Sequence, residues 1–215
     1  MLKKETAIKH ATILAAYLLV IWGFYRFLFK LPEEIEELIV KPILWLVPVF
    51  YLIRKEKTNL ESVGITFKNL LPSIYLSFGL GIVFTLEALL VNFVKYKGFN
   101  FSTLFSTDAL LISLGLSFAT AISEEIAFRG FLFGRLKSGI GKEWTANLIS
   151  SFVWALINVP ITIFVWKLGF SSALVYLVLT FFFGIGSAFV FARTKNILSS
   201  ILLHVFWAWP IILFR

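Results

Sequence analysis

The sequence contains no cysteine, only two histidines, His10 and His204, and a single aspartate, Asp108. The absence of cysteine excludes a thiol nucleophile, a disulfide framework and thiolate metal ligands. One aspartate cannot form the carboxyl pair of an aspartic protease. Two histidines this far apart cannot form the His-Glu-x-x-His helix motif of zinc proteases. These absences leave serine, or glutamate working with a histidine, as candidates for hydrolytic chemistry.

Charged residues are also scarce, at 15% of the chain, whereas hydrophobic residues make up 59% and the mean hydropathy is +0.90. Ordinary soluble domains contain roughly 45–50% apolar residues. Apolar stretches near or above the roughly 18–20 residues needed to cross a bilayer recur with short polar interruptions. We therefore expect one integral membrane domain over residues 1–215, an all-α polytopic transmembrane helix bundle of about seven to eight helices.

Helical-length apolar runs are predicted at 7–29, 38–53, 69–94, 109–136, 144–166, 172–192 and 197–214. The first run is too long for a signal peptide, and no small-residue cleavage site follows it, which favours a retained first helix. The run 38–53 is short and contains Pro42 and Pro48, so we expect it to be re-entrant or kinked.

The net charge of +8 comes from Lys and Arg residues at the ends of the apolar runs, not from a basic face of the kind that binds nucleic acid. With the amino terminus inside, thirteen of these cations fall in inner segments and seven in outer segments, which supports that orientation. If the chain had an eighth helix, or if the second run were re-entrant, one terminus would lie on the opposite side of the membrane. The outer segments are expected to hold Arg26, Lys30, Lys41, Lys95, Lys97, Lys167 and Arg215, together with Glu33, Glu34, Glu36 and Glu37.

Two adjacent carboxylates, Glu124 and Glu125, lie inside the fourth run together with Arg129. An ionisable residue at membrane depth costs at least about 2.5 kcal/mol, so it persists where it is paired, faces a wet cavity or does chemistry. Neighbouring helical residues point about 100° apart, so the two carboxylates cannot face one cleft. Glu125 and Arg129 have the spacing of an ion pair. This predicts that Glu124 faces the bundle interior beside Thr120 as a general base that deprotonates water.

The alternative is that both glutamates lie solvated at the cytoplasmic interface, held by Arg129 and Arg135, because charges near a helix end can reach water. The spacing alone leaves both interpretations open.

Other polar residues within the runs are His204, Asn158, Ser187 and Glu87. His204 is expected about 10 Å into the last helix, where it can share a cleft with Glu124. Asn158 precedes Pro160 and can hydrogen-bond a substrate carbonyl or an oxyanion. Ser187 with His204 would suit an intramembrane serine protease, although serines near glycines in such helices are mostly packing residues. A structural role is favoured for Glu87, and no pair of broken helices supports a transporter.

The arrangement of Glu124, Glu125 and Arg129 resembles a sequence motif of the CPBP family. This family comprises CAAX prenyl endopeptidases, bacteriocin-processing enzymes and their Abi relatives. Its first motif, Glu-Glu-x-x-x-Arg, is matched in full by Glu124, Glu125 and Arg129, followed by the usual Gly130. The resemblance covers residues 109–208, the expected catalytic core.

The second and third family motifs are matched with one departure each. The second, an aromatic residue, three others and a histidine, reads Trp154 to Asn158, with asparagine in place of histidine. The third, His-x-x-x-Asn, reads His204 to Ala208, with alanine in place of asparagine. Asparagine can orient a water but cannot accept and return a proton near neutral pH as imidazole does.

The resemblance implies that Glu124 and His204 hold and activate the water, with Asn158 orienting water or oxyanion and with Glu125 and Arg129 in support. A zinc site would have to rely on Glu124, Glu125 and little else, so no cofactor is expected.

Two functions stay open. The first is an intramembrane endopeptidase resembling type II CAAX prenyl proteases, with membrane lipid and a peptide or protein substrate, prenylated or not, as partners. The second, indicated by the changes at Asn158 and Ala208, is a catalytically silent relative that acts as an immunity, binding or scaffold protein. Either would be a multi-pass protein of a prokaryotic cell membrane, with its amino terminus in the cytoplasm.

Overall fold

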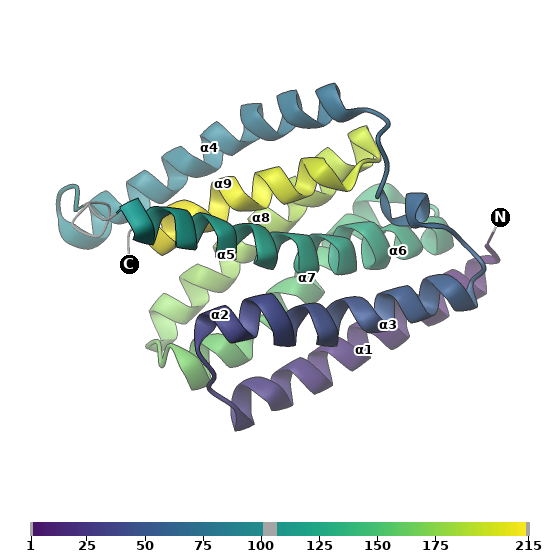
Figure 1. Ribbon diagram of the computed structural model, residues 1–215, viewed down its shortest axis with the longest axis horizontal. Coiled ribbons are helices and arrows are strands. Elements are labelled where there is room, and N and C mark those ends of the chain that lie inside the picture. The colour runs from purple at the N-terminus through teal and green to yellow at the C-terminus, as the bar shows by residue number, and fades with distance from the viewer. Residues whose placement is uncertain (1, 101–106, 214–215) are drawn as a thin grey trace.

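The structure of the protein, a computed structural model, describes residues 2–100 and 107–213. Within these ranges the chain forms helices joined by short connections and contains no strand (Figure 1). A helix satisfies all its backbone hydrogen bonds within one segment, as an apolar chain without access to water requires. The predicted all-α bundle is confirmed.

Most of the described chain belongs to long helices, several of which are extended by π-helical turns. The elements are α1 (Lys4–Leu28), α2 (Glu33–Ile35), η1 (Glu36–Val40), α3 (Lys41–Lys55), η2 (Leu60–Val63), α4 (Leu70–Tyr96), α5 (Thr107–Glu125), η4 (Ile126–Phe133), α6 (Gly134–Ile140), α7 (Glu143–Ile157), η5 (Ile161–Val165), α8 (Phe170–Thr194) and α9 (Ile197–Leu213).

Each of the seven predicted runs coincides with one helical stretch, and the ends differ by a few residues. The second stretch differs most. It begins at Glu33 and continues through α2, η1 and α3 to Lys55, with Pro48 inside the helix. The stretch packs against α1 and runs from one end of the bundle to the other (Figure 1).

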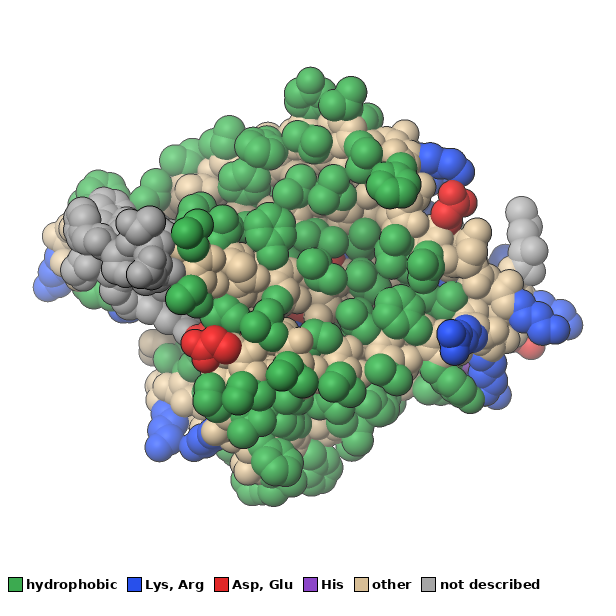
Figure 2. Space-filling view, in the orientation of Figure 1, with side chains coloured by type: hydrophobic (Ala, Val, Ile, Leu, Met, Phe, Trp, Pro, Cys, Tyr) green, Lys and Arg blue, Asp and Glu red, His purple; other side chains and the backbone are tan. Residues whose placement is uncertain are grey.

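Five helical stretches are long and apolar enough to cross a membrane: Lys4–Leu28, Leu70–Tyr96, Leu111–Ile140, Glu143–Val165 and Phe170–Thr194. Hydrophobic side chains cover most of the face seen in Figure 2, and charged side chains gather toward its two ends. This distribution matches an apolar belt between two aqueous surfaces. The protein is an integral membrane protein.

The helices pack in layers that bring the two halves of the sequence together. In Figure 1, α9 lies between α4 and α5, and α1 and α3 lie together on the opposite side. Helix α7 packs on α8, and α1 also contacts α6. The start of α1 and the end of α9 lie at opposite ends of the bundle (Figure 1).

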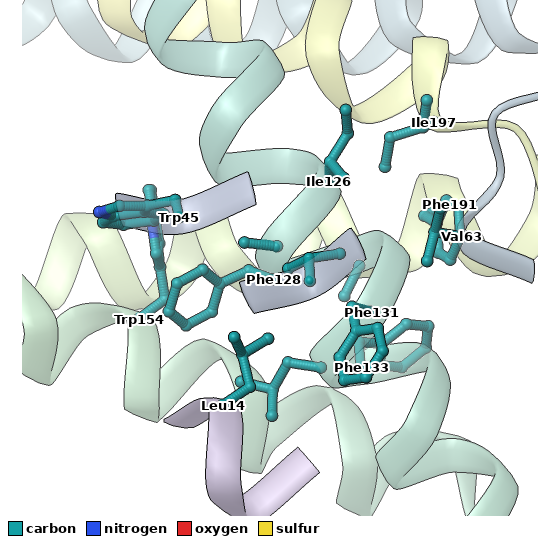
Figure 3. Packing of buried hydrophobic residues seen from close by; sticks show 14 of the residues in the cluster. Leu14, Trp45, Val63, Ile126, Phe128, Phe131, Phe133, Trp154, Phe191 and Ile197 are labelled. Atoms are coloured by element: carbon teal, nitrogen blue, oxygen red, sulfur yellow. The ribbon is translucent and has the colours of Figure 1, made fainter. Parts of the chain in front are cut away.

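Large aromatic side chains fill the space between these layers. Trp45 of α3, Phe128 of η4 and Trp154 of α7 meet in the core (Figure 3), and the rings of Trp45 and Phe128 lie 5.5 Å apart. All three are almost completely buried. Aromatic burial of this kind fixes the rotation of α3, η4 and α7 about their axes, and hence the direction of the polar residues beside them.

Gly130, the residue after the arginine of the first motif, lies where η4 passes close to η2. A Cβ atom at this position would lie 2.6 Å from the backbone carbonyl oxygen of Val63, which is too close for any side chain. The glycine is therefore required by the approach of two backbones.

Candidate active site

Glu124 lies near the carboxyl end of α5, and its side chain faces the interior of the bundle. Only 7% of the residue is exposed. Its Oε1 atom is 2.9 Å from Nζ of Lys41, and its Oε2 atom accepts a hydrogen bond of 2.8 Å from the indole Nε1 of Trp154. Burial of this degree rules out the alternative in which both glutamates are solvated at the interface.

Glu125 is completely buried and contacts three side chains. Its Oε2 atom lies 3.2 Å from Nε of Arg129, so the predicted ion pair is confirmed. Its Oε1 atom lies 2.7 Å from Nδ1 of His204, and Oε2 also accepts a 2.6 Å hydrogen bond from the hydroxyl of Ser187. The carboxylate thus joins α5, η4, α8 and α9 at one point.

The contact between Ser187 and Glu125 bears on the serine alternative. The hydroxyl of Ser187 is fully buried and donates a hydrogen bond to the carboxylate of Glu125. Nδ1 of His204 binds the same carboxylate and not the serine hydroxyl. A serine nucleophile needs a base at its own hydroxyl and access to substrate. Ser187 does not line the cavity, and its hydroxyl donates to Glu125 and not to the histidine, so the structure favours the packing role.

Glu124, His204 and Asn158 line a single cavity of about 100 Å³, as the sequence predicted for the first two. Ala208 also lines it, at the position where the family has asparagine. The remaining walls are largely aromatic, and the exposed Glu33 lies at the rim. The other lining residues are Trp22, Arg26, Glu37, Lys41, Trp45, Thr120, Ile161, Trp166, Tyr176 and Trp207.

His204 is held in one orientation by aromatic rings and by its carboxylate partner. The rings of Trp154, Phe183 and Trp207 lie between 5.2 and 5.9 Å from the imidazole, centre to centre. Because Nδ1 binds Glu125, the ring nitrogen left for the cavity is Nε2. An Nδ1–H donated to a carboxylate leaves Nε2 as an acceptor, which is the form that can receive a hydrogen bond from water.

Asn158 caps the carboxyl end of α7, two residues before Pro160. Its side-chain amide donates a 2.9 Å hydrogen bond to the backbone carbonyl of Trp154, and the hydroxyl of Tyr176 lies 3.5 Å from its Oδ1. One of its two amide protons is used by Trp154. The second can be donated within the cavity.

The comparisons with known proteins agree with the motifs. A family model described as type II CAAX prenyl endopeptidase Rce1-like matches residues 106–210. Residues 106–210, close to half of the chain, are therefore similar to this family. We found no match among the curated proteins and none among the solved structures. The Rce1-like region contains α5 through most of α9, and α1, α3 and α4 lie outside it.

Four charged residues from outside the Rce1-like region form a buried ladder that reaches Glu124. Arg26 contacts Glu36 and lies 3.6 Å from Glu37, Glu37 contacts Lys41, and Lys41 contacts Glu124. Thr120 of α5 donates a 2.5 Å hydrogen bond to Glu37. All four are buried, whereas charges assigned to segments outside the membrane are usually exposed.

The ladder was missed because charges at the end of an apolar run are the usual sign of a membrane boundary. A signal existed in the spacing of Glu37 and Lys41, which are four apart with the acid first and therefore able to pair on a helix. The contacts from Arg26 to Glu36 and from Lys41 to Glu124 join different helices, so helical spacing does not encode them.

The ladder and the Rce1-like site together hold four buried carboxylates and three buried cations. The carboxylates are Glu36, Glu37, Glu124 and Glu125, and the cations are Arg26, Lys41 and Arg129. The carboxylates thus outnumber these cations by one.

A metal ion is not accommodated by the residues of this Rce1-like site. Across residues 2–100 and 107–213, no three histidine, cysteine or carboxylate side chains are grouped so as to hold a metal ion. Glu124 and Glu125 already contact Lys41 and Arg129, whose positive charges would repel a cation. The donor set therefore does not fit zinc.

Glu87 lies in α4, half-buried and away from the cavity. In the part of the chain that the structure describes, it has no hydrogen-bond or ion-pair partner. It is not brought to the Rce1-like site, so its role in structure stays a prediction.

Proposed function

We propose that this protein is an intramembrane endopeptidase, which cleaves a peptide or protein at the membrane through a water activated by Glu124. The observation that carries the proposal is the convergence of Glu124 and His204, from different motifs and different helices, on one buried cavity. Paired acceptors of this kind orient a water for attack, and general base assistance contributes roughly a hundred- to ten-thousandfold in rate.

In this mechanism a water binds between the carboxylate of Glu124 and Nε2 of His204 and donates a hydrogen bond to each. As the water oxygen bonds to the scissile carbonyl carbon, Glu124 takes one proton. The carbonyl oxygen becomes negative and accepts a hydrogen bond from the side-chain amide of Asn158. The C–N bond then breaks, and the proton on Glu124 passes to the departing nitrogen. Glu125 fixes the tautomer of His204, and Arg129 balances the charge of Glu125.

A decisive test compares two matched variants of intramembrane glutamates. Glu124→Gln is expected to abolish cleavage of a suitable peptide while the protein stays folded. Glu87→Gln makes the same chemical change outside the cavity and is expected to leave cleavage unchanged. Prenylated and unprenylated peptides should both be assayed in detergent or vesicles, with folding followed by thermal unfolding. Cleavage by Glu124→Gln at the wild-type rate would contradict the proposal.

A second candidate is a catalytically silent relative that binds a partner through the same cavity. It is favoured by two observations: Asn158 stands in place of a histidine, and both oxygens of Glu124 already accept contacts, from Lys41 and Trp154. The combined variant Asn158→His with Ala208→Asn separates the two candidates. Cleavage that appears only in this double variant identifies a silent relative, whereas cleavage by the wild type identifies the enzyme.

The proposal includes an orientation, with the amino terminus in the cytoplasm of a prokaryotic cell and the carboxyl terminus outside. It is supported by the excess of Lys and Arg in the inner segments. Because the chain lacks cysteine, single introduced cysteines can be labelled without background. Lys97→Cys is expected to react with a membrane-impermeant maleimide from outside the cell, and Ser138→Cys only after the membrane is opened. The reverse pattern contradicts the orientation.

A further inference from the structure

Lys41 stands apart from the other lysines of the protein. It is the one lysine among the described residues that is buried, with 4% of its surface exposed. Its ammonium lies between two carboxylates, in contact with Glu37 and 2.9 Å from Glu124. The faces of Trp22 and Trp45 enclose it, with ring centres 5.5 and 5.8 Å away. It also lines the cavity.

A packing role does not account for this lysine. A buried ion pair is often no more stable than apolar side chains of the same size, and a charge at membrane depth costs at least about 2.5 kcal/mol. A leucine or methionine would fill the same space beside the tryptophans without that cost. The ammonium therefore serves the carboxylates that it contacts.

Position 158 indicates which carboxylate matters. Asn158 lines the cavity, but within the described residues its side chain hydrogen-bonds the Trp154 carbonyl and the Tyr176 hydroxyl and not Glu124. Among the described residues, the one cation in contact with Glu124 is Lys41. An ammonium has three protons to donate, and Glu37 and Glu124 account for two. The contacts with two carboxylates from different helices fix the position of the ammonium.

We propose that Lys41 is a positioning residue, which keeps Glu124 ionised and aimed into the cavity and so supplies the polar neighbour that Asn158 does not provide. This inference rests on the proposed function, in which Glu124 accepts the proton of water. Lys41 lies outside residues 106–210, so the inference places one residue of the site in the part of the chain that the family model does not match. The third proton of the ammonium can reach a group bound in the cavity.

The first experiment separates turnover from binding. Lys41→Met removes the charge and is expected to lower kcat by about a hundredfold or more while KM stays unchanged, because a small displacement of a catalytic group has that effect. Lys41→Arg keeps the charge and is expected to restore part of the lost kcat. Lys142→Met, at an exposed lysine, is the matched control and is expected to behave as wild type. A Lys41→Met variant with wild-type kcat overturns the proposal.

The second experiment needs no cleavage and keeps the two proposals distinguishable. A hydrophobic carbodiimide modifies protonated carboxyl groups within a membrane, and mass spectrometry identifies the modified peptide. Glu124 is expected to be modified in Lys41→Met and spared in the wild type and in Lys41→Arg. If Lys41→Met does not fold, Lys41→Gln, which keeps a donor but lacks the charge, replaces it with the same expectation.

Equal modification of Glu124 with and without the Lys41 charge overturns the inference. A wild-type protein that cleaves no peptide contradicts the proposed function instead, and the labelling pattern then decides whether Lys41 sets the charge of Glu124.

Discussion

Two buried clusters in this protein are built from the same three residue types and do different things. In each, one glutamate binds Nδ1 of a histidine through Oε1 and Nε of an arginine through Oε2. The corresponding distances are 2.9 and 2.8 Å in one cluster and 2.7 and 3.2 Å in the other. We call them the end triad, His10, Glu56 and Arg135, and the site triad, His204, Glu125 and Arg129.

The difference lies in what each triad leaves unpaired. In the end triad, the remaining nitrogens of Arg135 donate to Ser62 and Thr58, so the arginine is fully engaged. In the site triad, both terminal nitrogens of Arg129 lack a hydrogen-bond partner within the described part of the chain, and the guanidinium lies 4.3 Å over the ring of Trp154. In the end triad the arginine donors are all satisfied, and the triad holds neighbouring segments together as a structural clamp. In the site triad a histidine nitrogen faces a cavity, which makes it a candidate functional site.

The largest expected effect separates the two histidines by activity. His204→Ala is expected to lower the cleavage rate by roughly a hundred- to ten-thousandfold, because it removes one of the two groups that orient the water. His10→Ala is expected to leave the rate per folded molecule unchanged. Peptide cleavage normalised to the folded fraction is the measurement. Equal losses in both variants would show that the histidines share a structural role.

The next effect separates the glutamates by stability. Glu56→Gln leaves Arg135 buried without its counter-charge, and such a loss lowers the free energy of unfolding by about 3–5 kcal/mol. Cleavage by the folded fraction should persist. Glu125→Gln, by contrast, is expected to reduce both stability and cleavage, because its carboxylate also orients His204.

Unfolding by SDS titration in mixed micelles measures the change. The control is Glu61→Gln, an exposed residue whose ion pair with Lys68 is worth about 0–1 kcal/mol. A Glu56→Gln variant as stable as this control would mean that the end triad is not a clamp.

The smallest effect concerns the serine that touches each triad. Ser187→Ala removes one hydrogen bond to Glu125 and is expected to lower the free energy of unfolding by about 1 kcal/mol. Cleavage should be retained, since no nucleophile is lost. Ser62→Ala removes the hydroxyl that Arg135 binds and is the matched change in the end triad. Abolished cleavage in Ser187→Ala alone would restore the serine mechanism.

Sequence reasoning reached the parts of the protein that local spacing encodes. Seven apolar runs predicted seven helices, and a separation of four residues predicted the pair of Glu125 and Arg129. The depth of His204 along its helix led to the prediction that Glu124 and His204 share a cleft. All of these depend on residues near one another in the chain or on repeated patterns.

The missed features depend on how helices from distant parts of the sequence are rotated against one another. His204 was expected to work beside Glu124, but its direct contact is with Glu125. Lys41 was assigned to an outer segment for its charge alone, yet it is buried and contacts Glu124 of α5. Such contacts follow from the packing of large aromatic side chains, which no single helix specifies.

The ladder of Arg26, Glu36, Glu37 and Lys41 has a consequence for how the chain enters the membrane during synthesis. These four charges belong to the first two helical stretches and sum to zero. The hairpin formed by these two stretches can therefore enter the bilayer with its charges already paired. Later, when α5 arrives, Glu124 shares the ammonium of Lys41 with Glu37 and does not have to be neutralised alone. The order of synthesis thus delivers the counter-charge before the carboxylate that uses it.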